Sequence, residues 1–236
     1  MPPQISDAPL RLVVFDMDGT LVDSQHAILE AMTEAFGLRG HPLPPRETVL
    51  GIVGLSLPEA MAALAPHLPE AETLALAQAY RDGWLARRDA GGPVAEAPLY
   101  PGARAALERL AAADTLMGVA TGKARRGVDH VFRVHDLGRF FVTAQTADDH
   151  PSKPHPSMLE RALAETGAAR GIMVGDTEFD MAMAKAAGFG ALGVAWGYHP
   201  RARLEAAGAD VVIEDFDALD AALAELWGLA ETGARP

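Results

Sequence analysis

The chain lacks cysteine altogether. Disulfide bonds, thiolate catalysis and cysteine-bound metals are therefore excluded, and any metal ion must bind to oxygen atoms or to histidine. Basic residues are also scarce, because 20 Lys and Arg stand against 32 Asp and Glu in 236 residues, for a formal net charge of −12. Clustered Lys and Arg bind nucleic-acid backbones. This balance argues against a nucleic acid as the main partner, and a bound phosphate would need a local cation.

Long apolar runs are missing as well. No run approaches the roughly 18 residues that span a bilayer. The first residues, "MPPQISDAPLRL", do not have the basic and then apolar order of a secretory signal. We therefore expect a soluble cytoplasmic protein without a membrane partner, and nothing in the sequence indicates an oligomeric state. Hydrophobic residues make up 49% of the chain, which is enough for a globular core.

Short apolar runs with β-branched residues recur along the chain and predict buried strands. They read "LRLVVFD", "LMGVATG", "FFVTAQ", "GIMVGD", "ALGVAWG" and, near the end, "ADVVIED". Helical patterns such as "PGARAALERLAAA" lie between them, and "EFDMAMAKAAG" ends in a glycine that suits a helix C-terminus. This alternation predicts an α/β fold with a doubly wound, Rossmann-like parallel sheet that is covered by helices on both faces.

The alternation stops after the first strand, where a long segment is almost wholly helical in pattern. "SQHAILEAMTEAFG" places Ile28, Met32 and Phe36 on one face of a helix, and "LPEAMAALAPHL" and "AETLALAQAYRDGWLARRD" follow it. We therefore predict an all-helical cap domain inserted into an α/β core. The predicted boundaries are 24–96 for the cap and 1–23 with 97–236 for the core.

Polar side chains follow the predicted strands at their carboxyl ends, the edge where ligands bind to parallel α/β sheets. The candidates are Asp16 and Asp18 after the first strand, Thr121 and Gly122 after the second, Lys153 after the third, and Asp176 and Asp180 after the fourth. Each could by itself be a turn residue, a helix cap or a solvated side chain. The joint pattern, in this order, is much less expected by chance, so we expect these residues to converge on one crevice.

Acidic side chains that converge in this way repel one another. Two carboxylates about 5 Å apart repel by roughly 3 kcal/mol at an effective dielectric constant near 20. A bound divalent cation, a shared proton, or both would relieve this repulsion. Because the donors are carboxylate oxygens, the hard ion Mg²⁺ is favoured, and Mg²⁺ usually keeps waters and is completed by a substrate phosphate.

The same residue types suit phosphoryl transfer. An aspartate at the centre could attack phosphorus in line and form an aspartyl-phosphate. An acid two positions further on could protonate the leaving oxygen and later activate water. Asp16 fits the nucleophile and Asp18 fits the acid/base, while Lys153, Thr121 and loop N–H groups could bind the phosphoryl oxygens.

Four short segments resemble motifs one to four of the haloacid dehalogenase superfamily, and specifically its phosphoglycolate-phosphatase-like branch. They are "DMDGTLVDS", "VATGK", the lysine of "SKPHP", and "VGDTEFDMAMAKAAG". The resemblance covers essentially the whole chain. It implies a Mg²⁺-dependent phosphatase that acts on a small phosphorylated metabolite, with phosphoglycolate as a candidate substrate. It also implies a mobile helical cap whose segment "GIVGLSL", residues 51–57, is lowered toward the site.

The resemblance implies a role for each candidate residue. Asp16 matches the nucleophile, and Asp18 matches the general acid/base whose backbone carbonyl also binds Mg²⁺. Thr121 matches the phosphate-binding hydroxyl, and at Gly122, where this branch often has Asn, a backbone N–H replaces the side-chain contact. Lys153 matches the lysine that steadies the nucleophile and the phosphoryl group. Asp176 matches a ligand that binds Mg²⁺ with Asp16 and Asp18. Asp180 matches an acid that supports these ligands from behind them.

Alternative functions remain open at this point. One is a phosphosugar mutase similar to β-phosphoglucomutase, although mutases of this branch typically depart from the Gly19-Thr20-Leu21 run that this chain keeps. A second is a pyrophosphatase acting on inorganic or organic pyrophosphate. From a different class comes a phospho-accepting, receiver-type signalling module. The long helical insertion and the acid at Asp18, which is suited to catalysing phosphate release, argue against that reading.

Overall fold

The computed structural model describes residues 10–89, 97–113 and 115–232. Its core is one six-stranded parallel sheet with the order β3-β2-β1-β4-β5-β6. The strands are β1 (Arg11–Phe15), β2 (Leu116–Thr121), β3 (Thr143–Thr146), β4 (Arg170–Gly175), β5 (Gly190–Val194) and β6 (Val211–Ile213). The chain builds β2 and β3 on one side of β1 and then β4, β5 and β6 on the other. The strand order therefore reverses beside β1, where α/β sheets bind ligands.

Helices cover both faces of this sheet. They are α5 (Ala103–Ala112), α6 (Arg125–Val134), α7 (Ser157–Thr166), α8 (Glu178–Ala187), α9 (Arg201–Ala206) and α10 (Leu219–Thr232), with short 3₁₀ turns at Gly138–Phe140 and Phe216–Ala218. Alternate residues of a strand point to opposite faces. Val13 and Phe15 of β1 accordingly pack with α5 and α10, whereas Leu12 and Val14 pack with α7, α8 and α9. The predicted doubly wound α/β core is confirmed.

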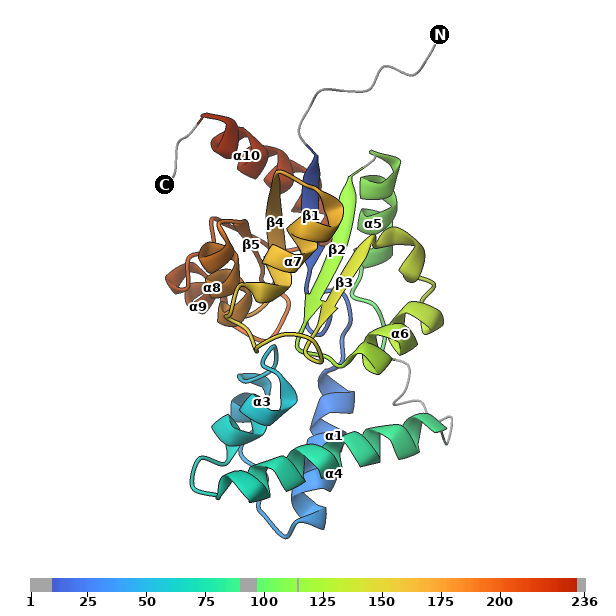
Figure 1. Cartoon of the computed structure of the whole chain (residues 1–236), viewed down its shortest axis with the longest axis vertical. Helices are drawn as coiled ribbons and strands as arrows, with labels where there is room; N and C mark the ends of the chain where they lie inside the picture. Colours follow the sequence, from blue (N-terminus) through green and yellow to red (C-terminus); the bar gives the residue numbers. More distant parts are fainter. Residues whose placement is uncertain (1–9, 90–96, 114, 233–236) are drawn as a thin grey trace.

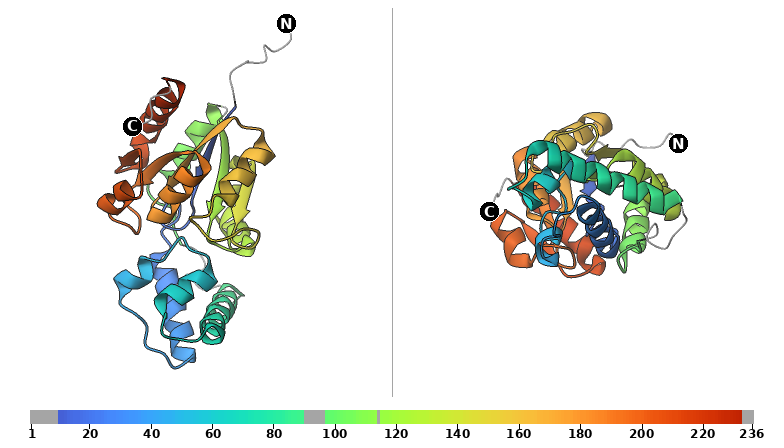
Figure 2. Two further views of the ribbon diagram at one scale, coloured as in Figure 1. Left: turned by 60° about the vertical axis from the view of Figure 1, so that its left-hand side comes forward. Right: turned by 90° about the horizontal axis from the view of Figure 1, so that it is seen from below.

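A helical segment lies at the carboxyl edge of the sheet, as Figure 1 and Figure 2 show. It contains α1 (Gln25–Leu38), α2 (Arg46–Leu50), α3 (Leu57–Leu64) and α4 (Glu70–Asp89). The predicted apolar face of α1, with Ile28, Met32 and Phe36, is buried in an apolar cluster of the segment's own. The predicted end of the cap at residue 96 falls outside the described residues, so the domain boundaries stay a prediction.

None of the helices in the described ranges has both the length and the apolar character needed to cross a membrane.

Candidate active site

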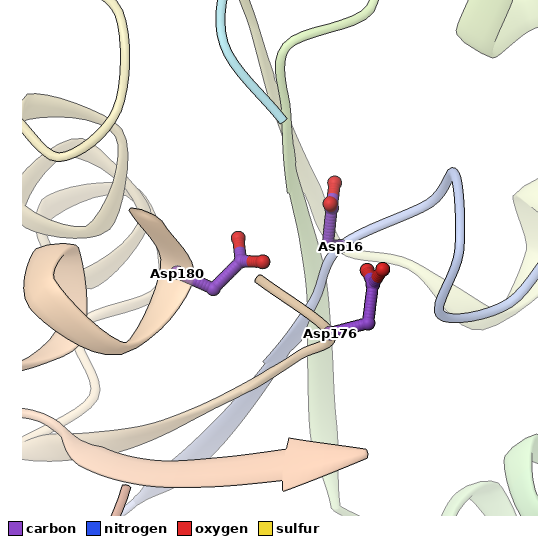
Figure 3. A group of neighbouring side chains, drawn as sticks. All are labelled: Asp16, Asp176 and Asp180. Carbon is purple, nitrogen blue, oxygen red and sulfur yellow. The ribbon is translucent and has the colours of Figure 1, made fainter. Parts of the chain in front are cut away.

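Three carboxylates meet at the carboxyl edge of the sheet, where the strand order reverses. Asp16 follows β1, Asp176 follows β4, and Asp180 lies in the first turn of α8, as Figure 3 shows. One oxygen of each lies within 4.8 Å of the other two, and all three residues are fully buried. Because β1 and β4 are neighbours in the parallel sheet, their ends place Asp16 beside Asp176.

A buried lysine in the loop after β3 faces this cluster. The ammonium nitrogen of Lys153 lies 3.0 Å from Oδ1 of Asp16 and 2.6 Å from Oδ1 of Asp180. Burial acts to lower the pKa of Lys153, but the charges of these two carboxylates and the hydrogen bonds to them outweigh burial and raise the pKa. Lys153 therefore stays protonated and compensates part of the negative charge.

When all three carboxylates are ionised, they carry more negative charge than Lys153 neutralises. Burial raises the pKa of Asp16 to about 7 against the lowering effect of Lys153, and the charge of Asp180 adds to the rise. Burial likewise raises the pKa of Asp176 well above its ordinary value, and the charges of Asp180 and Asp16 raise it further. Buried oxygen donors with surplus negative charge suit a hard divalent cation, so these residues fit the predicted Mg²⁺.

Two further contacts orient Asp176. The hydroxyl of Thr20 donates to its Oδ1 at 2.9 Å, and the backbone N–H of Tyr198 donates to its Oδ2 at 2.8 Å. Gly19 makes this close approach possible, because its φ is +87° and a Cβ there would lie 2.2 Å from Oδ2 of Asp176. Sequence reasoning gave Thr20 and Tyr198 no role in the site. The Gly-Thr pair directly after Asp18 could have indicated a role for Thr20 in the site. No sequence pattern indicates Tyr198, because it reaches Asp176 only through the tertiary fold.

The N-terminus of α8 holds Asp180 in place. Oδ2 of Asp180 accepts hydrogen bonds from the backbone N–H of Thr177 at 3.0 Å and from the Thr177 hydroxyl at 2.7 Å. The same hydroxyl accepts from the backbone N–H of Asp180, which completes a capping box. This leaves Oδ1 of Asp180 for Lys153. The residue expected to support the ligands from behind is thus itself one of the clustered carboxylates.

Asp18 lies apart from that cluster. Its Oδ2 pairs with Nζ of Lys123 at 2.9 Å, and the two side chains are 13% and 19% exposed. Of the three predicted Mg²⁺ ligands, the structure therefore brings together the side chains of Asp16 and Asp176, while the Asp18 carboxylate has a different partner. The resemblance implies that Asp18 binds Mg²⁺ through its backbone carbonyl. The ion pair of its side chain does not test this backbone contact, which stays a prediction. Sequence reasoning gave Lys123 no role.

A cavity of about 310 Å³ lies between the sheet and the helical segment. From the core it is lined by Asp16 and Asp18 and by Thr121 and Gly122 at the end of β2. The hydroxyl of Thr121 accepts a hydrogen bond from the backbone N–H of Lys123 at 3.2 Å. The structure thus brings Thr121 and Gly122, two of the three residues predicted to bind phosphate, to one cavity with the predicted nucleophile, whereas Lys153, the third, is buried beside Asp16 and does not line it.

The loop between α2 and α3 forms the opposite wall of this cavity. Its residues 52–56 line the cavity and fall within the segment predicted to be lowered toward the site. The loop backbone packs directly on Gly122, where a Cβ would lie 2.5 Å from the carbonyl oxygen of Leu55 and 2.7 Å from that of Gly54. A side chain at position 122 would therefore displace the loop.

Hydrogen bonds at both ends of the loop join it to the core. The backbone N–H of Ser56 donates to the hydroxyl of Ser152 at 2.8 Å. Nδ1 of His199 accepts from the backbone N–H of Glu178 at 3.0 Å, so Nε2 carries the proton and donates to the carbonyl of Gly51 at 3.0 Å. The cavity is thus closed on this side by a loop that is anchored at its first and last residues.

The chain matches the model of a known protein family. The model for the haloacid dehalogenase-like hydrolases covers residues 13–194, a range that contains every site residue predicted from the sequence. The chain therefore belongs to this family, as its four motifs predict.

Relatives within the family are named as phosphatases. "Probable phosphatase IndB" of Dickeya dadantii is 34% identical over 209 residues, which cover 87% of this chain and 90% of that protein. "Phosphoglycolate phosphatase, plasmid" of Cupriavidus necator is 30% identical over 224 residues, or 91% and 94% of the two chains. The structure of a haloacid dehalogenase-like hydrolase from Streptococcus pneumoniae, 27% identical, matches with a TM-score of 0.79 over 91% of this chain and 98% of that one. The prediction of a phosphatase is confirmed at the level of the family and these relatives.

Proposed function

We propose that this protein is a Mg²⁺-dependent phosphatase that hydrolyses a small phosphomonoester by way of an aspartyl-phosphate on Asp16. The observation that carries the proposal is the buried cluster of three carboxylates and Lys153 beside a cavity that Asp16, Asp18 and Thr121 line. A small phosphorylated metabolite as the partner and a cytoplasmic location belong to the same proposal.

Asp16 and Asp18 would divide the chemistry between them. An oxygen of Asp16 attacks phosphorus, and the bond from phosphorus to the ester oxygen breaks while Asp18 gives that oxygen a proton. Water then attacks phosphorus as Asp18 takes up the water's proton, and the bond to Asp16 breaks to release phosphate. Lys153 holds Asp16 in position for the attack, and the hydroxyl of Thr121 and the N–H of Gly122 would donate to phosphoryl oxygens.

Asp16, Asp176 and the backbone carbonyl of Asp18 would hold the Mg²⁺. When bound, the ion supplies positive charge that offsets the phosphoryl oxygens and the clustered carboxylates. The contacts from Thr20 and Tyr198 keep Asp176 oriented for this role.

The helical segment would contact the leaving group. The loop residues 52–56, together with Tyr80 and Trp84, line the same cavity as Asp16. The groups that bind phosphate and those that contact the rest of the substrate would therefore come from different elements. Phosphoglycolate is the first candidate substrate, because several relatives are named phosphoglycolate phosphatase. A screen of phosphorylated metabolites for kcat/KM in the presence of Mg²⁺ would rank it against sugar phosphates and pyrophosphate.

Replacement of the nucleophile tests the mechanism. Asp16→Asn should reduce kcat by about a thousandfold or more, since an amide cannot form the phosphoenzyme. The fold should persist, because burial raises the pKa of Asp16 and so favours a neutral side chain at this position. Phosphate release and thermal unfolding measure the two effects. Asp129→Asn, the same change at an exposed position on α6, is the control, and wild-type activity in Asp16→Asn would refute the mechanism.

A further inference from the structure

The ion pair between Lys123 and Asp18 has no role in the proposed phosphoryl chemistry. Lys123 directly follows Gly122, and its side chain runs over the first turn of α6. A Cβ on Gly127 would lie 2.7 Å from Cγ of Lys123, so this glycine leaves room for the lysine stem. The packing directs the ammonium group into the cavity, to within 2.9 Å of Asp18.

The ammonium group of Lys123 can bind a second anion. It has three protons to donate, and the Asp18 carboxylate needs one of them. Because Lys123 is partly exposed and lines the cavity, a ligand there can reach it. Asp16 and Asp18 line the same cavity and would repel an anionic leaving group. Lys123 is placed to offset that repulsion.

The distance between Lys123 and Asp18 limits where such an anion can lie on the substrate. To give its proton to the ester oxygen, Asp18 must lie one hydrogen-bond length from that oxygen. Nζ of Lys123 lies a further hydrogen-bond length from the same carboxylate. A carboxylate attached to the carbon that bears the ester oxygen starts two bonds from that oxygen, so it can reach the ammonium group while the oxygen stays beside Asp18.

We propose that Lys123 is a specificity-determining residue that binds a carboxylate on the carbon bearing the phosphoester. The enzyme would then select phosphate esters of 2-hydroxy acids over neutral esters of the same size. This inference rests on the proposed phosphatase function. Phosphoglycolate, the first candidate substrate, already belongs to this class of esters, and the inference adds the residue that recognises the carboxylate. Lys123 shares its charge between Asp18 and the substrate carboxylate, and so holds the leaving group beside the acid/base.

Three esters of similar size test the proposal. In 2-phosphoglycerate a carboxylate replaces one hydroxymethyl group of glycerol 2-phosphate, and in 3-phosphoglycerate the carboxylate lies one carbon farther from the ester. With Mg²⁺ present, kcat/KM for 2-phosphoglycerate should exceed that for each of the others by about tenfold or more. Lys123→Met keeps the length of the stem without its charge. It should raise KM for 2-phosphoglycerate and remove the preference, whereas a lysine that only positions Asp18 would slow all three esters equally.

Two variants serve as controls. Arg126→Met removes another basic side chain that lines the cavity from α6 but is exposed, and it should leave the preference unchanged. Lys123→Arg keeps the charge and should retain part of the preference. No preference in the wild type, or an undiminished preference in Lys123→Met, overturns the proposal. If Lys123→Met does not fold, the wild-type comparison and Lys123→Arg decide.

p-Nitrophenyl phosphate separates this proposal from the phosphatase function itself. One outcome is that the wild type hydrolyses p-nitrophenyl phosphate, loses this activity in Asp16→Asn, and yet shows no preference for 2-phosphoglycerate. That result rejects the role of Lys123 but supports the phosphatase function. If the protein hydrolyses none of these four esters and does not hydrolyse phosphoglycolate, both proposals are rejected.

Discussion

Among single residues, Asp176 occupies the most demanding position in the site. It is fully buried and its pKa is raised, and its two oxygens are held by a hydroxyl and a backbone N–H. Lys153 instead pairs with Asp16 and Asp180. Contacts that support Asp176 should therefore affect metal binding more than the chemical step.

Removal of the Thr20 hydroxyl tests this dependence. Thr20→Val keeps the shape of the side chain but loses the hydrogen bond to Asp176, and outer contacts of this kind typically contribute 10-fold to 100-fold in metal affinity. We expect the Mg²⁺ concentration for half-maximal activity to rise by about tenfold or more, with most of kcat regained at saturating Mg²⁺. Thr20→Ser keeps the hydroxyl and should stay close to the wild type. An unchanged Mg²⁺ titration in Thr20→Val would show that the hydroxyl does not support the metal site.

At this scale the sequence predicts the clustered residues better than their contacts. The convergence of Asp16, Lys153 and Asp176 could be predicted, because the ends of parallel strands meet at one edge of a sheet. The pairing of Lys123 with Asp18 could not, since it depends on how α6 lies against the cavity. Asp180 was expected in the same crevice, but only behind the metal ligands. Its carboxylate joins the cluster directly because a capping box holds it there, and the sequence indicates that capping box only as the start of a helix.

Among the elements, the loop between α2 and α3 joins the helical segment to the core by direct contacts. Its backbone occupies the space that a side chain at position 122 would fill. This explains why glycine stands at this position, where the branch that the chain resembles often has asparagine.

Asparagine at this position should therefore disturb the loop. Because the clashing atoms in Gly122→Asn are backbone carbonyls, the loop has to shift. We expect KM for the preferred ester to rise by about tenfold, a change of roughly 1.4 kcal/mol, while Asp16 remains able to react with a small, activated ester. Steady-state kinetics with both esters measure the effect. A variant with wild-type KM would mean that the loop does not contribute to substrate binding.

A matched glycine substitution is available in α1. Gly37 is helical and has no atom within 4 Å of the position that a Cβ would take. Gly37→Ala should therefore leave KM unchanged and raise stability by about 0.5–1 kcal/mol through helix propensity.

The strands could be predicted more completely than the parts that join them. Each strand of the sheet's centre is buried on both faces, which imposes the continuous apolar runs that the sequence displays. The short helix α2 follows a proline-rich link and was not predicted, because it has only one buried residue, Val49, to create a pattern. The hydrogen bond between His199 and the carbonyl of Gly51 joins distant parts of the chain. Such a contact leaves no periodic pattern in the sequence from which it could be predicted.

For the molecule as a whole, a concentration of buried negative charge at the carboxyl edge of the sheet should make stability depend on Mg²⁺. A ligand that binds only the folded state stabilises it by about 2.7 kcal/mol at 100 times its Kd. For a chain of this size that corresponds to a rise in Tm of roughly 5–10 °C. EDTA should abolish both the shift and the activity, and Mg²⁺ should restore them.

A control variant links that shift to the carboxylate cluster. Asp176→Asn removes one of the proposed ligands, and its Tm should respond much less to Mg²⁺ than that of the wild type. Thermal unfolding with and without Mg²⁺ measures both proteins. An equal shift in the two would place the stabilising ion elsewhere, and metal-independent hydrolysis would contradict the proposed function.

The cavity has walls from two sources, and this limits how substrate choice can be transferred between relatives. The loop residues 52–56 come from the helical segment. Gly122, which lets that loop approach, and Lys123 follow strand β2 of the sheet. A chimaera that receives only the helical segment of a relative would therefore combine that relative's loop with Gly122 and Lys123 of this chain. To transfer the substrate preference of a relative, positions 122 and 123 should have to be exchanged together with the helical segment.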